Sequence, residues 1–328
     1  MRAVAAFGPR VDDLRDVDLP LPMPGPHDLV VEVRAVSVNP VDYKQRGRVS
    51  LGDAPRVLGF DAAGIVRQVG AEVTLFAAGD EVWYAGDVTR PGTNSAFHVV
   101  DERIVGFKPV SLGFAEAASL PLTAITAWES LFDKLRVAPG QRGSLLVVGG
   151  AGGVGSILIQ LARALTELTV IATASRPESR DWVSRLGAQH VIDHTRALAP
   201  AVKDIFSGGV DLAFSSWTQG READLADALS PQGELVLVDS PEPFDLLAFK
   251  PKSASVHWEN MFTRSTFQTP DMIVQHELLD HVAKLVDAGK VRHTMTRRLV
   301  GINADNLRQA HEQVATGAGI GKLVLSRD

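Results

Sequence analysis

Cysteine is absent from this 328-residue chain. Its absence excludes disulfide bridges and every metal site that needs a thiolate ligand. Long hydrophobic runs are absent too, and no stretch approaches the roughly 20 apolar residues of a membrane span. The first residues hold a short apolar run that Gly8 and Pro9 interrupt, which is not the pattern of a secretory signal peptide. We therefore expect a cytoplasmic protein.

A strong excess of one charge is also missing. The chain has 33 Lys and Arg residues against 39 Asp and Glu residues, a formal net charge of -6. This balance argues against nucleic acid or an anionic membrane surface as a partner. Hydrophobic residues make up 45% of the chain and charged residues 22%, as in ordinary globular proteins. The length is large for a single core, so we expect two domains.

The first third of the chain has the pattern of a β-barrel. Short β-rich runs are separated by glycine and proline turns, at residues 2–7, 29–38, 64–69, 81–85 and 97–100. Helical periodicity is scarce here and first becomes clear over residues 114–137. We predict a compact barrel followed by one or two helices.

Strands and helices alternate in the middle of the chain. Strand-like runs occupy residues 169–174, 190–192, 210–214, 235–239 and 254–258, and helical patterns occupy 178–186 and 223–229. Such alternation is typical of a parallel sheet with helices on both faces. The end of the chain adds a helix at 271–289, a strand at 295–300, a helix at 304–314 and a strand at 322–325.

A glycine turn follows the strand-like run that begins at Leu145. Gly150, Gly152 and Gly155 have the G-x-G-x-x-G spacing, and apolar residues at helical spacing follow them up to Leu165. Such a turn lets the backbone approach a pyrophosphate at the N-terminus of a helix. A glycine-rich turn can also be only a turn, but the strand–turn–helix context favours a dinucleotide site. The predicted cofactor contacts are Gly150, Ala151, Gly152, Gly153, Val154 and Gly155.

The tip of the following strand predicts which cofactor binds. An acidic residue about 20 positions after the first motif glycine would bind the 2′-hydroxyl of NADH. This chain instead has Ser175 and Arg176, with Arg180 one helical turn later. Arginine donates bidentate, charge-assisted hydrogen bonds to phosphate, so we predict NADPH. The alternative is a helix-capping serine followed by a solvated arginine.

The chain resembles the medium-chain dehydrogenase/reductase superfamily, and within it the zinc-independent quinone oxidoreductases related to zeta-crystallin. The motifs are AVSVNPVDYKQRG at 35–47, VLGFDAAGIVRQVG at 57–70, GDEVW at 79–83, LPLTAITAWESL at 120–131, VGGAGGVGSILIQLAR at 148–163, LGAQHVIDH at 186–194 and GKLVL at 321–325.

This resemblance implies an α/β protein with a GroES-like β-barrel catalytic domain and a doubly wound, parallel-sheet Rossmann domain. The catalytic domain would comprise residues 1–120 and 265–328, and the Rossmann domain residues 121–264. It also implies a homodimer that pairs edge strands of the Rossmann sheets, at residues 253–258.

The resemblance also allows a test for zinc. Where zinc-dependent members have their first cysteine ligand this chain has Asn39, and where they have Gly-His-Glu it has Gly59, Phe60 and Asp61. A catalytic zinc keeps three N, S or O ligands, and these substitutions leave only Asp61. We therefore predict that the protein binds no metal.

By the same resemblance, several residues would face the nicotinamide pocket. Asn39 and Tyr43 are candidate orienting or proton-donating groups, although Tyr43 could equally be a core or loop aromatic. Thr126 is a third candidate for the catalytic site, its alternative being a helix residue that bonds its own backbone. The predicted lining residues are Val238, Asp239, Met261 and Phe262. Lys322 would approach the cofactor or lie solvated at a strand end.

Together these residues predict an NADPH-dependent, metal-free oxidoreductase that transfers hydride to a quinone or a related conjugated carbonyl compound. One alternative is an alkenal or enoyl double-bond reductase. Another is a sensor or structural protein that binds NADPH without turnover. The polar candidates Asn39, Tyr43 and Thr126 favour an enzyme.

Overall fold

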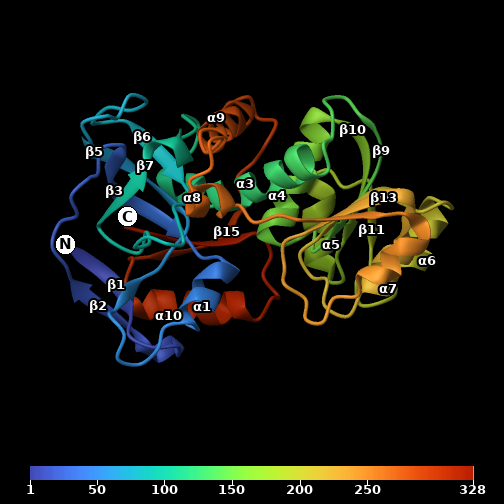
Figure 1. The fold of residues 1–328 in the computed structure, drawn as a ribbon, viewed down its shortest axis with the longest axis horizontal. Helices are drawn as coiled ribbons and strands as arrows, with labels where there is room; N and C mark the ends of the chain where they lie inside the picture. Colours follow the sequence, from blue (N-terminus) through green and yellow to red (C-terminus); the bar gives the residue numbers. More distant parts are fainter. Residues whose placement is uncertain (328) are drawn as a thin grey trace. The chain divides into compact units, whose positions relative to one another are not determined.

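The chain folds into two compact units (Figure 1). The computed structural model describes residues 1–327. Unit 1 comprises Met1–Ile125 and Phe262–Asp328, and unit 2 comprises Thr126–Met261. The boundaries predicted from the sequence followed residues 120 and 264, whereas the contacts divide the chain after Ile125 and Met261.

Unit 1 is built on two sheets. The larger one has the order β15-β16-β3-β5-β6-β8, with β7 also paired to β3, and the smaller one has the order β2-β1-β4. The strands are β1 (Arg2–Ala6), β2 (Leu14–Asp18), β3 (Asp28–Ser37), β4 (Arg56–Val57), β5 (Ala62–Val69), β6 (Glu81–Tyr84), β7 (Phe97–Asp101), β8 (Val105–Phe107), β15 (Met295–Val300) and β16 (Lys322–Ser326). β16 pairs antiparallel with β3, so the last strand of the chain completes a sheet begun by the first hundred residues.

Short helices accompany these sheets. They are α1 (Pro40–Arg46), α2 (Phe114–Ala117), α3 (Pro121–Trp128, which runs across the division between the units), α8 (Thr263–Phe267), α9 (Val274–Asp287) and α10 (Ala304–Ala315). α1 was not predicted from the sequence; it begins after Asn39, which is extended, and Pro40 supplies the fixed φ of the first helical position. No helix among residues 1–327 is long and apolar enough to cross a membrane.

Unit 2 is a parallel sheet of the order β11-β10-β9-β12-β13-β14. Its strands are β9 (Arg142–Val148), β10 (Glu167–Thr173), β11 (His190–Ile192), β12 (Val210–Ser215), β13 (Leu229–Leu237) and β14 (Ser255–Trp258), and its helices include α4 (Gly153–Leu165), α5 (Pro177–Arg185), α6 (Leu198–Ile205) and α7 (Glu222–Ala228). The order reverses at β9, which is the topological switch point where doubly wound sheets bind ligands. The predicted fold class is therefore confirmed.

β14 forms one edge of this sheet and pairs with β13. Trp258 at its end is 50% exposed. An edge strand offers unpaired backbone groups to a second strand. Pairing of two copies of the chain through β14 stays a prediction.

Candidate functional site

The glycine turn lies at the switch point of unit 2. β9 ends at Val148, Gly149 adopts a φ of 83°, and α4 begins at Gly153 with Gly152 as its N-cap. A Cβ on Gly155 would lie 2.4 Å from the Gly149 carbonyl oxygen, so only glycine allows α4 to pack this close to the turn. A Cβ on Gly152 would lie 3.3 Å from the same oxygen, which is tight but tolerable. Gly155 therefore serves the fold, whereas Gly152 keeps the outer side of the turn open.

This turn fits the pyrophosphate of a dinucleotide. Ala151, Gly152, Gly153 and Val154 are half-buried, and no side chain caps the N-terminus of α4. The first N–H groups of a helix have no intrahelical partner and carry a partial positive charge. Unit 2 thus presents the donors that a pyrophosphate needs, at the residues predicted for it.

A group of polar side chains, which we call the basic cluster, lies at the carboxyl ends of the unit 2 strands. It consists of Ser175, Arg176, His194, Trp217 and Arg221. Ser175 Oγ lies 3.3 Å from His194 Nε2, and Arg221 Nη2 donates to the His194 carbonyl oxygen at 2.7 Å. The Arg221 guanidinium stacks 4.2 Å from the centre of the Trp217 ring, while Arg176 is exposed beside Ser175.

The basic cluster contains two arginines, Arg176 and Arg221, whereas the third arginine of this region, Arg180, has other contacts. The Arg180 guanidinium donates to the carbonyl oxygens of Ala174 (3.2 Å) and Val191 (3.0 Å), so it ties the end of β10 to β11. These contacts favour a positioning role for Arg180 over the phosphate contact predicted for it. Arg221 reaches the same region from the loop after β12 and was missed in the sequence. Its signal was its place just after the predicted strand at 210–214.

His194 was also missed as a site residue. Its Nδ1 is buried and has no hydrogen-bond partner within residues 1–327. Burial lowers the pKa of His194, and the nearby charges of Arg221 and Arg176 lower it further. The imidazole is therefore neutral near pH 7. Its Nδ1 is available to a ligand, and a bound anion would change the protonation of the ring.

Asp239 has a defined partner in unit 2. Its carboxylate accepts from the Thr218 backbone N–H (2.6 Å) and from Thr218 Oγ1 (2.7 Å). Asp239 thereby holds the loop that carries Trp217 and Arg221. Val238 is half-buried and donates its N–H to the Ser215 carbonyl. The nicotinamide contacts predicted for both residues stay predictions.

A second set of residues, which we call the Lys322 cluster, is buried in unit 1. It consists of Ser37, Asn39, Asp42, Asp61 and Lys322, each no more than 5% exposed. The Lys322 ammonium lies 3.0 Å from the Val38 carbonyl oxygen and 3.4 Å from Asp61 Oδ2, and it also donates to Asn39 Oδ1. Asn39 Nδ2 donates to Asp61 Oδ2 at 2.8 Å.

These contacts change the interpretation of two predicted residues. Both polar atoms of the Asn39 side chain are used inside unit 1, and Asn39 is 1% exposed. They favour a positioning role for Asn39 over proton donation. The buried ammonium of Lys322 likewise favours this cluster over the predicted cofactor contact and over a solvated strand end.

The charges of the Lys322 cluster are balanced by their neighbours. Asp61 accepts from Ser37 Oγ (2.7 Å), from Asn39 Nδ2 and, through Oδ1, from the Leu122 N–H (2.8 Å). Burial raises the pKa of Asp61 and lowers that of Lys322, and each charge opposes the shift of the other. Because Asp61 is surrounded by donors and Lys322 by oxygen acceptors, we assign them as an ion pair. Burial raises the pKa of Asp42 to about 7.

The residues of this cluster do not fit a zinc ion. Zinc takes cysteine, histidine or carboxylate ligands in a tetrahedron. Asp61 supplies a single carboxylate, Asn39 supplies an amide, which is not among these ligands, and a lysine ammonium already contacts both side chains. Among residues 1–327, no three His, Cys, Asp or Glu side chains gather closely enough to hold a metal ion.

The remaining predicted residues lie in different parts of the two units. Tyr43 is half-buried on α1. Thr126 is 5% exposed on α3. Met261 ends unit 2 and Phe262 opens the second segment of unit 1, where its ring meets the Phe60 ring edge-on at 5.6 Å. Among the three catalytic candidates, Tyr43 is the one with an available proton donor on a partly exposed side chain.

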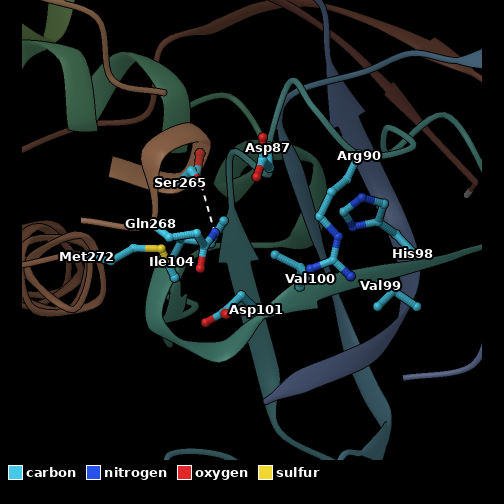
Figure 2. Close-up of a pocket in the computed structure, with 10 residues that line it drawn as sticks. All are labelled: Asp87, Arg90, His98, Val99, Val100, Asp101, Ile104, Ser265, Gln268 and Met272. Carbon is cyan, nitrogen blue, oxygen red and sulfur yellow. Dashed lines mark hydrogen bonds between the residues drawn. The ribbon is translucent and has the colours of Figure 1, made fainter. Parts of the chain in front are cut away.

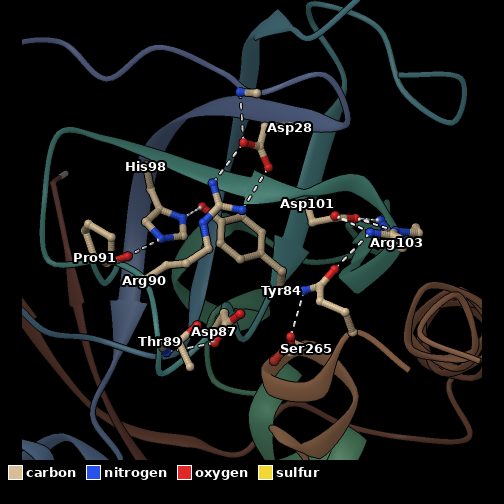
Figure 3. A network of polar contacts seen from close by, with 12 residues as sticks. Asp28, Tyr84, Asp87, Thr89, Arg90, Pro91, His98, Asp101, Arg103 and Ser265 are labelled. Atoms are coloured by element: carbon tan, nitrogen blue, oxygen red, sulfur yellow. Dashed lines mark hydrogen bonds and ion pairs between the residues drawn. The ribbon is translucent and has the colours of Figure 1, made fainter. Parts of the chain in front are cut away.

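A small hollow lies elsewhere in unit 1 (Figure 2). Its charged groups each have a partner: Arg90 binds Asp28 with two bonds of 2.8 and 2.9 Å, Asp101 binds Arg103, and Asp87 accepts from Thr89 (Figure 3). His98 Nε2 donates to the Pro91 carbonyl, so its Nδ1 accepts from the Tyr84 hydroxyl. These pairs account for the polar lining as part of the fold, and we assign the hollow no catalytic role.

Two buried histidines predict how the stability of the protein responds to acid. Burial lowers the pKa of His98 to about 4 and that of His311 to about 3. The unfolded chain binds protons at these histidines below pH 6.5 and the folded chain does not, so their contribution to stability falls as the pH drops below about 6.5, while the raised pKa of Asp42 acts in the opposite direction. At pH 5 each histidine should cost about 2 kcal/mol of unfolding free energy.

Urea unfolding at pH 7.5 and pH 5 measures this loss. His311 Nδ1 accepts from Arg46 Nη1 at 2.9 Å, and a glutamine oxygen can replace that acceptor. His311→Gln should therefore reduce the loss of unfolding free energy between pH 7.5 and pH 5 by about 2 kcal/mol relative to the wild type. His281→Gln, an exposed histidine on α9, is the control and should leave it unchanged. Equal slopes in all three proteins would contradict this assignment.

Comparisons with known proteins agree with the fold of both units. Residues 25–129 match the alcohol dehydrogenase GroES-like domain, and residues 186–325 match the zinc-binding dehydrogenase family. A zinc-type alcohol dehydrogenase-like protein of Staphylococcus aureus is 41% identical over 311 residues, covering 93% of this chain and 92% of that protein. A tomato (Solanum lycopersicum) 2-methylene-furan-3-one reductase is 37% identical over 206 residues, covering 60% of this chain and 51% of the reductase.

Solved structures share the whole fold. The crystal structure of a candidate zinc-dependent alcohol dehydrogenase from Rhizobium etli has a TM-score of 0.96 and 52% identity, covering 100% of this chain and 98% of that one. A quinone oxidoreductase from Pseudomonas syringae has a TM-score of 0.86 and 25% identity, covering 99% of each chain. The chain therefore belongs to the medium-chain dehydrogenase/reductase superfamily of NAD(P)-dependent oxidoreductases, and within it to the zinc-type alcohol dehydrogenase-like proteins.

Proposed function

We propose that this protein is a metal-independent, NADPH-dependent reductase of quinones or related conjugated carbonyl compounds. The observation that carries the cofactor part is the basic cluster at the carboxyl ends of the unit 2 strands. Where NADH would need a carboxylate, Ser175 and Arg176 are joined by Arg221 and His194. Four cationic or donor side chains at neighbouring strand ends suit a doubly charged phosphate.

Unit 2 residues would hold the cofactor through its two phosphate regions. The pyrophosphate would lie at the glycine turn and the N-terminus of α4, and the 2′-phosphate at Ser175, Arg176 and Arg221. When bound, NADPH supplies a hydride from its nicotinamide ring. Trp217 offers a flat face, already stacked with Arg221, on which an adenine ring could pack.

The acceptor class follows from the residues of unit 1. A buried lysine ammonium lies between Asn39 and Asp61, so this cluster offers no ligand set for a Lewis-acid metal that would activate an alcohol. Conjugated carbonyl compounds need only a hydride and a proton, and Tyr43 is the candidate proton donor to the oxygen. The tomato reductase is named for a conjugated ketone, which supports the same class here.

Oxidation of NADPH against a small panel tests this function. We expect turnover of a benzoquinone and a naphthoquinone, slower turnover of a linear enal, and none of a simple saturated aldehyde. Prolonged dialysis against a chelator should leave these rates unchanged. Rates that fall and return only with added zinc would contradict the metal-independent mechanism.

Two alternatives predict other outcomes of the same panel. Preference for the enal over both quinones would identify a double-bond reductase. Tight NADPH binding without turnover of any acceptor would identify a sensor or structural protein.

Arg221 offers a separate test of the phosphate contact. Arg221→Gln removes one charged donor, so the dissociation constant of NADPH should rise about 10-fold while that of NADH changes less than about threefold. Fluorescence titration with each cofactor measures this. Arg196→Gln, an exposed arginine in the segment after β11, is the matched control. An equal loss for both cofactors would place Arg221 away from the 2′-phosphate.

A further inference from the structure

The Lys322 cluster is a buried ion pair that the proposed hydride transfer does not use directly. Burying a lysine and an aspartate is expensive unless each finds partners. Here the ammonium contacts three oxygen atoms, those of Val38, Asn39 and Asp61. Such a costly group is expected to have a function that an apolar pair could not perform.

Its contacts converge on the start of α1. The ammonium binds the Val38 carbonyl and the Asn39 side chain, the two residues before the helix. The Asn39 N–H in turn donates to Asp42 Oδ2 in the first turn at 2.5 Å. The end of α1 is held separately, because Arg46 binds His311 on α10. Tyr43 lies between these two anchors.

The cluster also joins segments that are distant in the chain. Lys322 begins β16, Asn39 follows β3, and Asp61 precedes β5 and binds the Leu122 N–H at the start of α3. Oxygen atoms with a carboxylate among them are the surroundings of a bound cation. In this chain the cation among these oxygen atoms is the side-chain ammonium of Lys322, a residue of the last strand.

We propose that the Lys322 ammonium is a built-in cation that locks Asn39 and Asp61 in place and thereby positions α1 and Tyr43. Lys322 is in this view a positioning residue that touches neither substrate nor cofactor. Its link to Tyr43 rests on the proposed function, whereas its role as the resident cation does not.

The kinetic test uses Lys322→Met, with Lys44→Met on the exposed side of α1 as the matched control. We expect kcat of Lys322→Met to fall at least 10-fold while the dissociation constant of NADPH stays within twofold, because the phosphate contacts lie in unit 2. Lys44→Met should match the wild type in both. Adding Tyr43→Phe to Lys322→Met should lower kcat by less than a further twofold. Wild-type kcat in Lys322→Met, or fully multiplicative losses, would overturn the positioning role.

Two measurements do not depend on turnover. Lys322→Met and Asp61→Leu should each lower the melting temperature. The double variant should lose less than the sum of the two single losses, because neither charge is then left buried without its partner. Additive losses would overturn the ion pair. Dialysis against zinc followed by mass spectrometry should find less than 0.1 zinc per wild-type chain, and one zinc per chain that Asp61→Leu removes would overturn the built-in cation.

These arms separate the two proposals. If no acceptor is reduced, the proposed function fails, while the melting temperatures and the zinc content still decide whether Lys322 is the cation of this site.

Discussion

Gly152→Val is expected to weaken NADPH binding by more than about 100-fold without unfolding the protein. The Cβ position of Gly152 lies 3.3 Å from the Gly149 oxygen and its φ is -71°, so the turn needs to shift by only a few tenths of an ångström to admit a side chain. The valine methyl groups would instead occupy the space that a pyrophosphate needs. Fluorescence titration with NADPH measures the loss, and circular dichroism and the melting temperature report the fold.

Two variants complete that experiment. Gly152→Ala adds one methyl group and should give an intermediate loss. Gly155→Ala should unfold or destabilise unit 2, because its Cβ would lie 2.4 Å from a backbone oxygen. Wild-type NADPH affinity in a folded Gly152→Val protein would refute the glycine turn as the pyrophosphate site.

Arg176→Glu is expected to shift the ratio of kcat/KM for NADPH over NADH by at least about 100-fold towards NADH. The substitution removes a bidentate donor and places a carboxylate where a 2′-phosphate would lie and where a ribose hydroxyl could be bound. Steady-state kinetics with both cofactors measure the ratio.

Arg185→Glu provides the matched control for this charge reversal. Arg185 is exposed at the other end of α5, so its replacement by glutamate makes the same change of charge at the same helix. It should shift the ratio less than threefold. Equal ratios in Arg176→Glu and the wild type would exclude Arg176 from the phosphate site.

The sequence was sufficient for unit 2 because its signals are local. Strand–helix alternation and the glycine turn each depend on neighbouring residues, and the parallel sheet with β9 at its switch point follows from them. β13 began earlier than predicted, at Leu229 rather than 235, because Pro231 and Gly233 have the composition of a turn. The structure accommodates them with a register shift against β12 and with Gln232 at a φ of 65°.

The sequence was insufficient for the Lys322 cluster because its contacts are not local. Nothing near Lys322 distinguishes a solvated lysine from a buried one. The antiparallel register of β16 on β3 brings it to Val38 and Asn39, nearly 300 positions earlier. α1 was missed for another reason: its signal is the cap Asn39-Pro40-Val41-Asp42, not a hydrophobic period. A search for helix starts would have found it.

The most direct test of this account is calorimetric titration of the wild-type protein with NADPH and with NADH at the same pH and ionic strength. The basic cluster predicts that NADPH binds at least about 10-fold more tightly, with a preference that weakens as salt is raised. Equal affinities, or tighter binding of NADH, would contradict the assignment of Ser175, Arg176 and Arg221 to a 2′-phosphate.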